Sequence, residues 1–98
     1  MKHQEIATLV KRHEAEIRAR GVIRLEVFGS SARGDTHDES DVDVVIDIEP
    51  GRKFSLIDHA SLRVMLCDIF QRETDVVVRD ALRPAFRDHI ARESVRVL

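Results

Sequence analysis

Two aspartates, Asp41 and Asp43, stand where a polar stretch gives way to an apolar run that ends at Ile48. Side chains of a strand alternate between its two faces, so both carboxylates point to one side while Val42 and Val44 point to a core. Neighbouring carboxylates repel each other, and a divalent cation is the simplest group to offset that repulsion. Hard oxygen ligands of this kind suit Mg²⁺. Asp47 has the same parity but lies roughly 13 Å beyond Asp43, too far to share a metal.

A second chemical feature precedes the aspartates, where the apolar run from Val22 to Phe28 ends in Gly29-Ser30. Glycine lets the backbone approach a ligand closely. If Ser30 opens a helical turn that includes Arg33, free amide groups of that turn can hold a phosphate. The two features together would suit a nucleoside triphosphate with magnesium. An ordinary exit from a strand into a turn is the alternative interpretation of Gly29-Ser30.

The spacing of these features resembles that of a known family. Gly29-Ser30, ten residues, and then Asp41-x-Asp43 is similar to the signature of the polymerase-beta-like nucleotidyltransferase superfamily. The fuller run, which includes Ala32, Arg33 and Ser40, resembles the minimal nucleotidyltransferase (MNT) family, whose members are often antitoxins of HEPN-domain ribonuclease toxins. Asp75, before Val76, Val77 and Val78, resembles that family's third carboxylate. Glu73 and Asp80 are the local alternatives to Asp75.

The resemblance implies site residues and their roles. Asp41 and Asp43 would bind two Mg²⁺ ions, with Mn²⁺ as an alternative, and Asp75 would hold the catalytic ion and help to deprotonate the incoming hydroxyl. Gly29 and Ser30 would contact the phosphates of ATP. Arg33 would also reach a phosphate, although a surface ion pair with a nearby aspartate of the loop explains it as well.

The resemblance further implies transfer of AMP from ATP to a tyrosine hydroxyl of a cognate HEPN toxin, which would be silenced within a hetero-oligomer. Two alternatives stay open: an antitoxin that acts by binding alone, and an aminoglycoside-type enzyme that modifies a small molecule. The chain has no tyrosine of its own. Three retained carboxylates favour catalysis over simple occlusion, and the short chain leaves no room for the extra helical domain of the aminoglycoside enzymes.

Composition bounds these interpretations. Ninety-eight residues suit one domain, here residues 1–98, and the net charge of −2 lacks the basic excess typical of nucleic-acid binding. Cys67 is the only cysteine, so no internal disulfide forms. Neither a signal peptide nor an apolar run long enough for a membrane span is present, and we expect a cytoplasmic protein. Arginines concentrate near the carboxyl end, where Arg83 and Arg87 are candidates to face a partner.

Hydrophobic periodicity supplies the elements that must position these residues. It predicts a helix over residues 2–20, strands over 22–28, 41–48 and 74–78, a helix over 54–71, a helix from Pro84, and an extended tail over 94–98. A helix between the second and third strands allows those two to be parallel. The expected fold is α/β (α+β), a small mixed sheet with helices on one face, as in the palm-like nucleotidyltransferase core. We expect the central helix to bury a wide apolar face: Ile57, Ala60, Leu62, Val64, Leu66, Cys67, Ile69 and Phe70.

Overall fold

A computed structural model describes residues 1–29, 32 and 41–98 of the chain, and its centre is a four-stranded mixed sheet in the order β3-β2-β1-β4. β1 (Val22–Phe28) runs antiparallel to β2 (Val42–Ile48), and β2 runs parallel to β3 (Thr74–Val78). The predicted strands and the parallel pair are therefore confirmed. The predicted tail contributes β4 (Val95–Arg96), which pairs antiparallel with β1.

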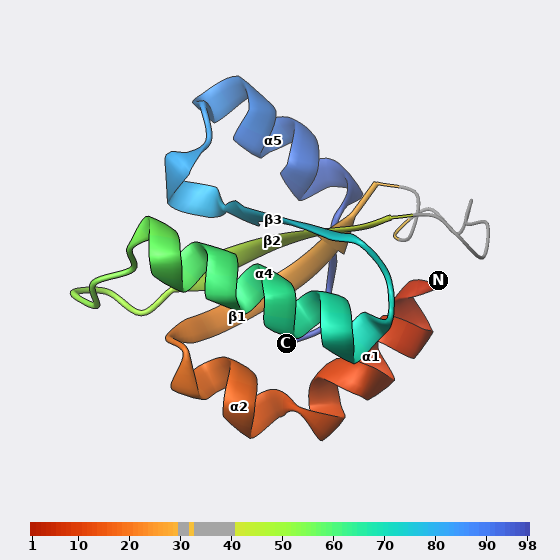
Figure 1. The fold of residues 1–98 in the computed structure, drawn as a ribbon. Coiled ribbons are helices and arrows are strands. Elements are labelled where there is room, and N and C mark those ends of the chain that lie inside the picture. Colours follow the sequence, from red (N-terminus) through yellow and green to blue (C-terminus); the bar gives the residue numbers. More distant parts are fainter. Residues whose placement is uncertain (30–31, 33–40) are drawn as a thin grey trace.

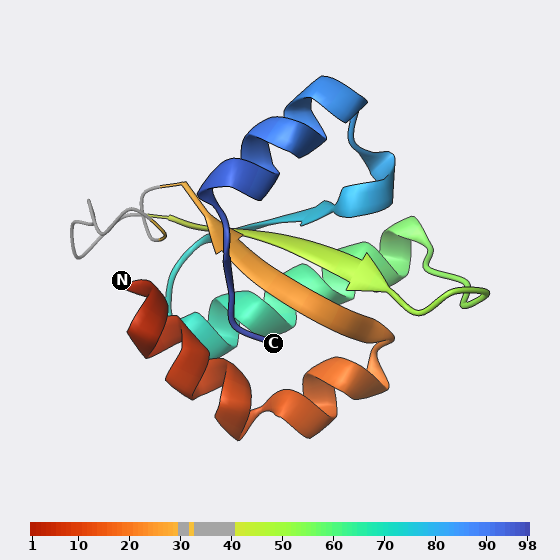
Figure 2. The same ribbon diagram turned by 180° about the vertical axis from the view of Figure 1, so that it is seen from behind.

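Helices cover both faces of this sheet. α1 (His3–Arg12), α2 (Glu14–Ala19) and α4 (Leu56–Phe70) lie together on one face, the single face on which helices were predicted (Figure 1). α5 (Pro84–Glu93) lies over the other face, where Figure 2 shows its carboxyl end leading directly into the tail. A short 3₁₀ turn, η1 (Arg79–Ala81), joins β3 to α5.

The amino-terminal helix is broken, which the sequence did not predict. His13 leaves the helical conformation at φ −112° and ψ 17°, so the expected helix over 2–20 becomes α1 and α2. The break lets the two halves pack on different elements, α1 against α4 and α2 against β1. Tertiary packing therefore overrides a helical pattern that was continuous in sequence.

The main core lies between the sheet and the three helices of its first face. Its fully buried side chains come from α1, α2, β1, β2 and α4: Ile6, Val10, Ile17, Val22, Leu25, Val27, Val42, Val44, Ile46, Leu62, Leu66 and Phe70. Strand alternation would place Ile23 on the same face as the buried Leu25, but Ile23 is 42% exposed. A register shift between Val22 and Arg24 turns it outward, as a bulge does.

α4 begins at a capping box in which the Ser55 hydroxyl accepts from the Asp58 amide and the Asp58 carboxylate accepts from the Ser55 amide. Its inward side chains are Leu62, Leu66 and Phe70. The predicted burial of the rest of its apolar face is wrong: Ile57 is 81% exposed, Val64 is 58% exposed, Ala60 is exposed, and Cys67 is only half-buried. Apolar residues occur on all sides of this helix, so periodicity alone could not choose the buried face.

The second face of the sheet carries a smaller buried region beneath α5. Val45 of β2 and Ile90 of α5 are both buried, and neither belongs to the main core. Val45 shares its strand parity with Asp43 and Asp47, so this face also holds the charged residues of the sheet. Within the described residues, no helix has both the length and the apolar character needed to cross a membrane.

Candidate active site

Asp43 and Asp75 lie directly opposite each other on neighbouring strands. The parallel pairing of β2 with β3 sets Asp43 against Asp75, and the Val42 amide begins this ladder by donating to the Glu73 carbonyl at 2.9 Å. Paired residues of adjacent strands share a face, and the strands are about 4.8 Å apart. Two carboxylates separated by 31 intervening residues therefore lie on the same face of adjacent strands.

Asp41 is exposed and stands immediately before β2, two residues from Asp43. In the part of the chain that the structure describes, no group of three Asp, Glu, His or Cys side chains lies close enough together to enclose a metal ion by itself. That arrangement still fits magnesium, which proteins commonly bind through one or two carboxylates while substrate phosphates and waters complete the shell. The donor set is acidic oxygen throughout, so it suits Mg²⁺ or Mn²⁺ and not a softer metal.

Gly29 forms the third side of this site. It follows β1 at φ +72°, and Phe28 before it pairs with Asp43 across the β1–β2 ladder. A Cβ atom at position 29 would lie 2.7 Å from Oδ2 of Asp43. The backbone at Gly29 therefore passes against the Asp43 carboxylate at a distance that only glycine permits. A phosphate held there would need a cation between itself and Asp43.

The remaining predicted phosphate contacts, Ser30 and Arg33, lie outside the described residues. Ala32, between them, is helical and half-buried. The predictions for Ser30 and Arg33 therefore stay predictions. The described members of the candidate site, Gly29, Asp41, Asp43 and Asp75, all lie at one end of the sheet, where β1 ends and β2 and β3 begin (Figure 1).

An ion-pair network that the sequence reasoning missed occupies the same face of the sheet, farther along the strands. Arg79 of η1 donates from Nε to Asp47 at 2.9 Å and from Nη2 to Glu26, and Arg24 lies 2.9 Å from the other oxygen of Asp47. Burial alone would lower the pKa of Arg79, but its hydrogen bonds and charge interactions with Glu26 and Asp47 outweigh burial and raise it. The network ties β1, β2 and η1 together. Asp47 is thus engaged with arginines, away from the carboxylate pair.

Two side chains of α4 fix the strand that carries Asp75. Arg63 donates from Nε to the Thr74 carbonyl at 3.1 Å, and His59 donates from Nε2 to the Val76 carbonyl at 2.7 Å. These carbonyls flank Asp75 and point to the open edge of β3, because successive residues of a strand direct their polar groups to opposite sides. Arg63 and His59 therefore act as positioning residues for Asp75. The sequence analysis missed both residues; their spacing of four on one helix, which places them on the same face, is a signal that could have grouped them.

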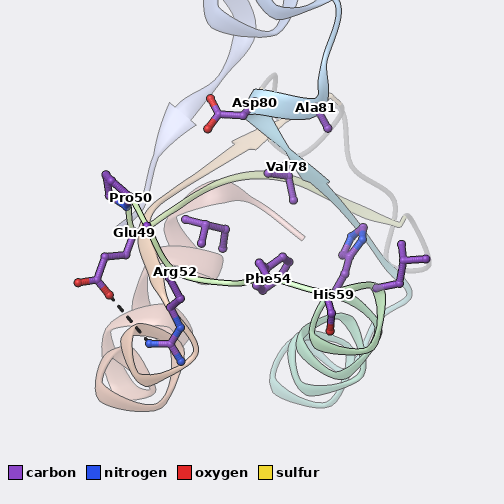
Figure 3. Close-up of a pocket in the computed structure, with 12 residues that line it drawn as sticks. Glu49, Pro50, Arg52, Phe54, His59, Val78, Asp80 and Ala81 are labelled. Atoms are coloured by element: carbon purple, nitrogen blue, oxygen red, sulfur yellow. Dashed lines mark ion pairs between the residues drawn. The ribbon is translucent and has the colours of Figure 1, made fainter.

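A cavity of about 490 Å³ lies at the opposite end of the sheet, between the β2–α4 connection and η1 (Figure 3). Phe54, His59, Val78 and Asp80 are among its lining residues, and Arg52 forms a 4.0 Å ion pair with Glu49 at its rim. Gly29, Asp41, Asp43 and Asp75 are absent from its lining. The cavity is therefore separate from the carboxylate pair.

Known proteins of similar sequence and structure identify the family of this chain. The protein adenylyltransferase MntA of Thermococcus cleftensis is 33% identical over 95 residues, which cover 96% of this chain and 94% of that protein. A solved structure assigned as a minimal nucleotidyltransferase is 30% identical, superposes with a TM-score of 0.80, and aligns over 97% of this chain and 95% of its own.

A more distant structure shares the fold alone. It contains the tri-AMPylated HEPN toxin of Shewanella oneidensis in complex with its MNT antitoxin, and aligns at 13% identity and a TM-score of 0.67 over 94% of this chain and 71% of that one. The model of the nucleotidyltransferase domain family matches residues 10–97, which span every strand and the candidate site. The chain therefore belongs to the nucleotidyltransferase domain family.

Proposed function

We propose that this protein is a magnesium-dependent nucleotidyltransferase that transfers AMP from ATP to a tyrosine hydroxyl of a cognate HEPN ribonuclease toxin, and thereby acts as its antitoxin. The observation that carries this proposal is the juxtaposition of Asp43, Asp75 and Gly29 at one end of the sheet. The named relatives supply the substrate class and the partner: one is a protein adenylyltransferase, and another is an MNT antitoxin bound to an AMPylated HEPN toxin.

The proposed reaction is a displacement at the α-phosphorus of ATP. The acceptor oxygen forms a new bond to that phosphorus, and the bond between the α-phosphorus and the bridging oxygen breaks. Pyrophosphate leaves with the bonding electron pair. The hydroxyl proton passes to the carboxylate of Asp75, which is exposed and therefore accessible to an acceptor from outside the chain.

Other residues of the chain would bind the metal ions, bind the triphosphate and position Asp75. Asp41, Asp43 and Asp75 would hold the magnesium ions, which when bound neutralise charge on the phosphates and the attacking oxygen. The backbone at Gly29 and Ser30, with Arg33, would hold the triphosphate. His59 and Arg63 would keep Asp75 opposite Asp43 by anchoring β3 on both sides of it.

The partner would bring its own acceptor, because the chain contains no tyrosine and has no second domain among its described residues. Of the two arginines predicted to face a partner, Arg83 is exposed at the start of α5. Arg87 is half-buried and donates back to the Leu82 carbonyl at 3.5 Å, so it is less available. Because the donor is ATP, we place the reaction in the cytoplasm.

Mass spectrometry of the partner encoded beside this gene tests the proposal. The partner is incubated with the protein, magnesium and each nucleoside triphosphate in turn, and we expect addition of one or more AMP groups from ATP. Asp43→Asn with Asp75→Asn should abolish the addition. Asp80→Asn should preserve it, since Asp80 is an exposed carboxylate at the other end of β3. A toxin that is neutralised without any added mass would refute transfer and favour simple occlusion.

A further inference from the structure

The outward side of α4 carries an exposed apolar stripe, formed by Ile57, Ala60 and Val64. Ile57 is 81% exposed, Val64 is 58% exposed, and Leu56 beside them is 86% exposed. Positions 57, 60 and 64 recur every three to four residues and so lie on one side of the helix. Figure 1 shows α4 in front of the sheet with no labelled element over it. A helix that is apolar on all sides is normally buried on all sides, so the stripe indicates a missing neighbour.

We propose that the neighbour is a second copy of this chain, with the two α4 helices packed antiparallel across a two-fold axis between Ala60 and Ser61. Such an axis sets Ile57 of one copy against Val64 of the other, and repeats that contact by symmetry. Ala60 at the centre is small enough to let the helices approach closely. The stripe is thus complementary to itself, which is the requirement for a closed two-fold interface.

The charges that flank the stripe obey the same symmetry. Lys53 lies before the amino end of α4, and Asp68 lies near its carboxyl end. The proposed axis places Lys53 of one copy beside Asp68 of the other. Both side chains are exposed, and no ion pair links either of them to another described residue of the chain. Antiparallel helices also align their macrodipoles favourably. This charge complementarity favours a second copy over an unrelated apolar partner.

The edges of the sheet disfavour the other common route to a dimer, in which edge strands of two copies pair with each other. The open edge of β3 has two of its carbonyls occupied by His59 and Arg63, and β4 at the opposite edge is only two residues long. Short or covered edges discourage strand addition from another chain. The proposed helix contact leaves Asp43 and Asp75 open, because they lie on the sheet face opposite α4.

The mass of the purified protein in solution tests this inference, and it does so without reference to catalysis. Light scattering after size exclusion, with loading from about 10 μM to about 1 mM, covers the range in which small interfaces assemble. We expect the mass to rise from 11.2 kDa towards twice that value. Ile57→Glu should stay at the monomer mass throughout. Phe86→Glu, which changes an exposed apolar side chain on α5, should dimerise like the wild type.

Exchanging the charges of Lys53 and Asp68 distinguishes the proposed register of the two α4 helices from nonspecific association. Lys53→Glu or Asp68→Lys alone should weaken dimerisation about tenfold at low salt, because each dimer contains the pair twice. The double variant should recover the wild-type dissociation constant. Circular dichroism of every variant establishes that it is folded. A wild type that remains monomeric at the highest loading, or a folded Ile57→Glu variant that still dimerises, would overturn the inference. Monomeric wild type with partner binding lost in Ile57→Glu would instead assign the stripe to the toxin.

Discussion

Replacing Gly29 with alanine should separate the chemistry of the site from the stability of the fold. Position 29 has φ +72°, a conformation that costs an ordinary L-residue about 1–2 kcal/mol. That loss corresponds to a melting temperature lower by roughly 4–8 °C per kcal/mol in a domain of this size. The new Cβ would also lie 2.7 Å from Oδ2 of Asp43, so the carboxylate must retreat before it reaches ordinary contact at 3.4 Å or more.

The retreat of Asp43 should reduce activity more than stability. Misplacement of a reacting group by about 1 Å costs about a hundredfold in rate, so we expect Gly29→Ala to lose between about tenfold and a hundredfold in AMP transfer. The assay pairs urea denaturation with the rate of transfer to the partner.

Gly51→Ala is the matched control for Gly29→Ala. Position 51 has φ +81°, and an added Cβ there would meet no described atom within 4 Å apart from its own chain neighbours. It should therefore show a similar loss of stability with unchanged activity. Full activity in Gly29→Ala, or equal losses of activity in both variants, would refute the assignment of Gly29 to the site.

Three further predictions follow from the charged groups. Asp41→Asn with Asp43→Asn keeps the shape of both side chains and should fold, but should lose transfer; an unfolded double variant would make these residues structural. Arg79→Met should lower the free energy of unfolding by about 2 kcal/mol, because it removes the more buried of the two arginines, Arg79 and Arg24, that both pair with Glu26 and Asp47; an unchanged urea midpoint would contradict that role. Hydrogen bonds from the Ser55 amide and hydroxyl are the main reason that the pKa of Asp58 lies below its ordinary value of 3.8. A depressed folded-state pKa stabilises the fold above pH 3.8 and loses that effect as the pH falls through the folded value, so Asp58→Asn should show a smaller loss of stability on acidification from pH 5 to below that value.

Local sequence signals sufficed for the part of the fold that positions the site. β1 and β3 have the predicted bounds, and the alternation around Asp43 gave the correct buried face of β2. Gly29 and Asp43 could be expected to lie near each other because consecutive strands of a chain commonly pair, and Gly29 follows the first strand while Asp43 stands near the start of the second. Asp75 could be placed opposite Asp43 only through the resemblance to the family, since nothing local fixes the register of parallel strands.

The incorrect predictions have a common physical origin in packing between distant segments. His13 breaks the first helix because α1 and α2 pack on different neighbours, and no helix breaker stands in the sequence there. The buried face of α4 was assigned too widely because its outward residues are as apolar as its inward ones. Arg79 forms ion pairs with Glu26 and Asp47, each more than thirty residues away in the chain, and no spacing in the sequence predicts such distant pairs.

The central claim is that Asp43 and Asp75 form a metal-dependent ATP site, and isothermal titration calorimetry with ATP in the presence and absence of magnesium tests it most directly. If the carboxylates and the phosphates share the metal, wild-type protein should bind ATP at least about tenfold more tightly with magnesium than without it. Asp43→Asn with Asp75→Asn should remove that difference, whereas Asp80→Asn should retain it. ATP binding of equal strength with and without magnesium in the wild type would contradict the claim.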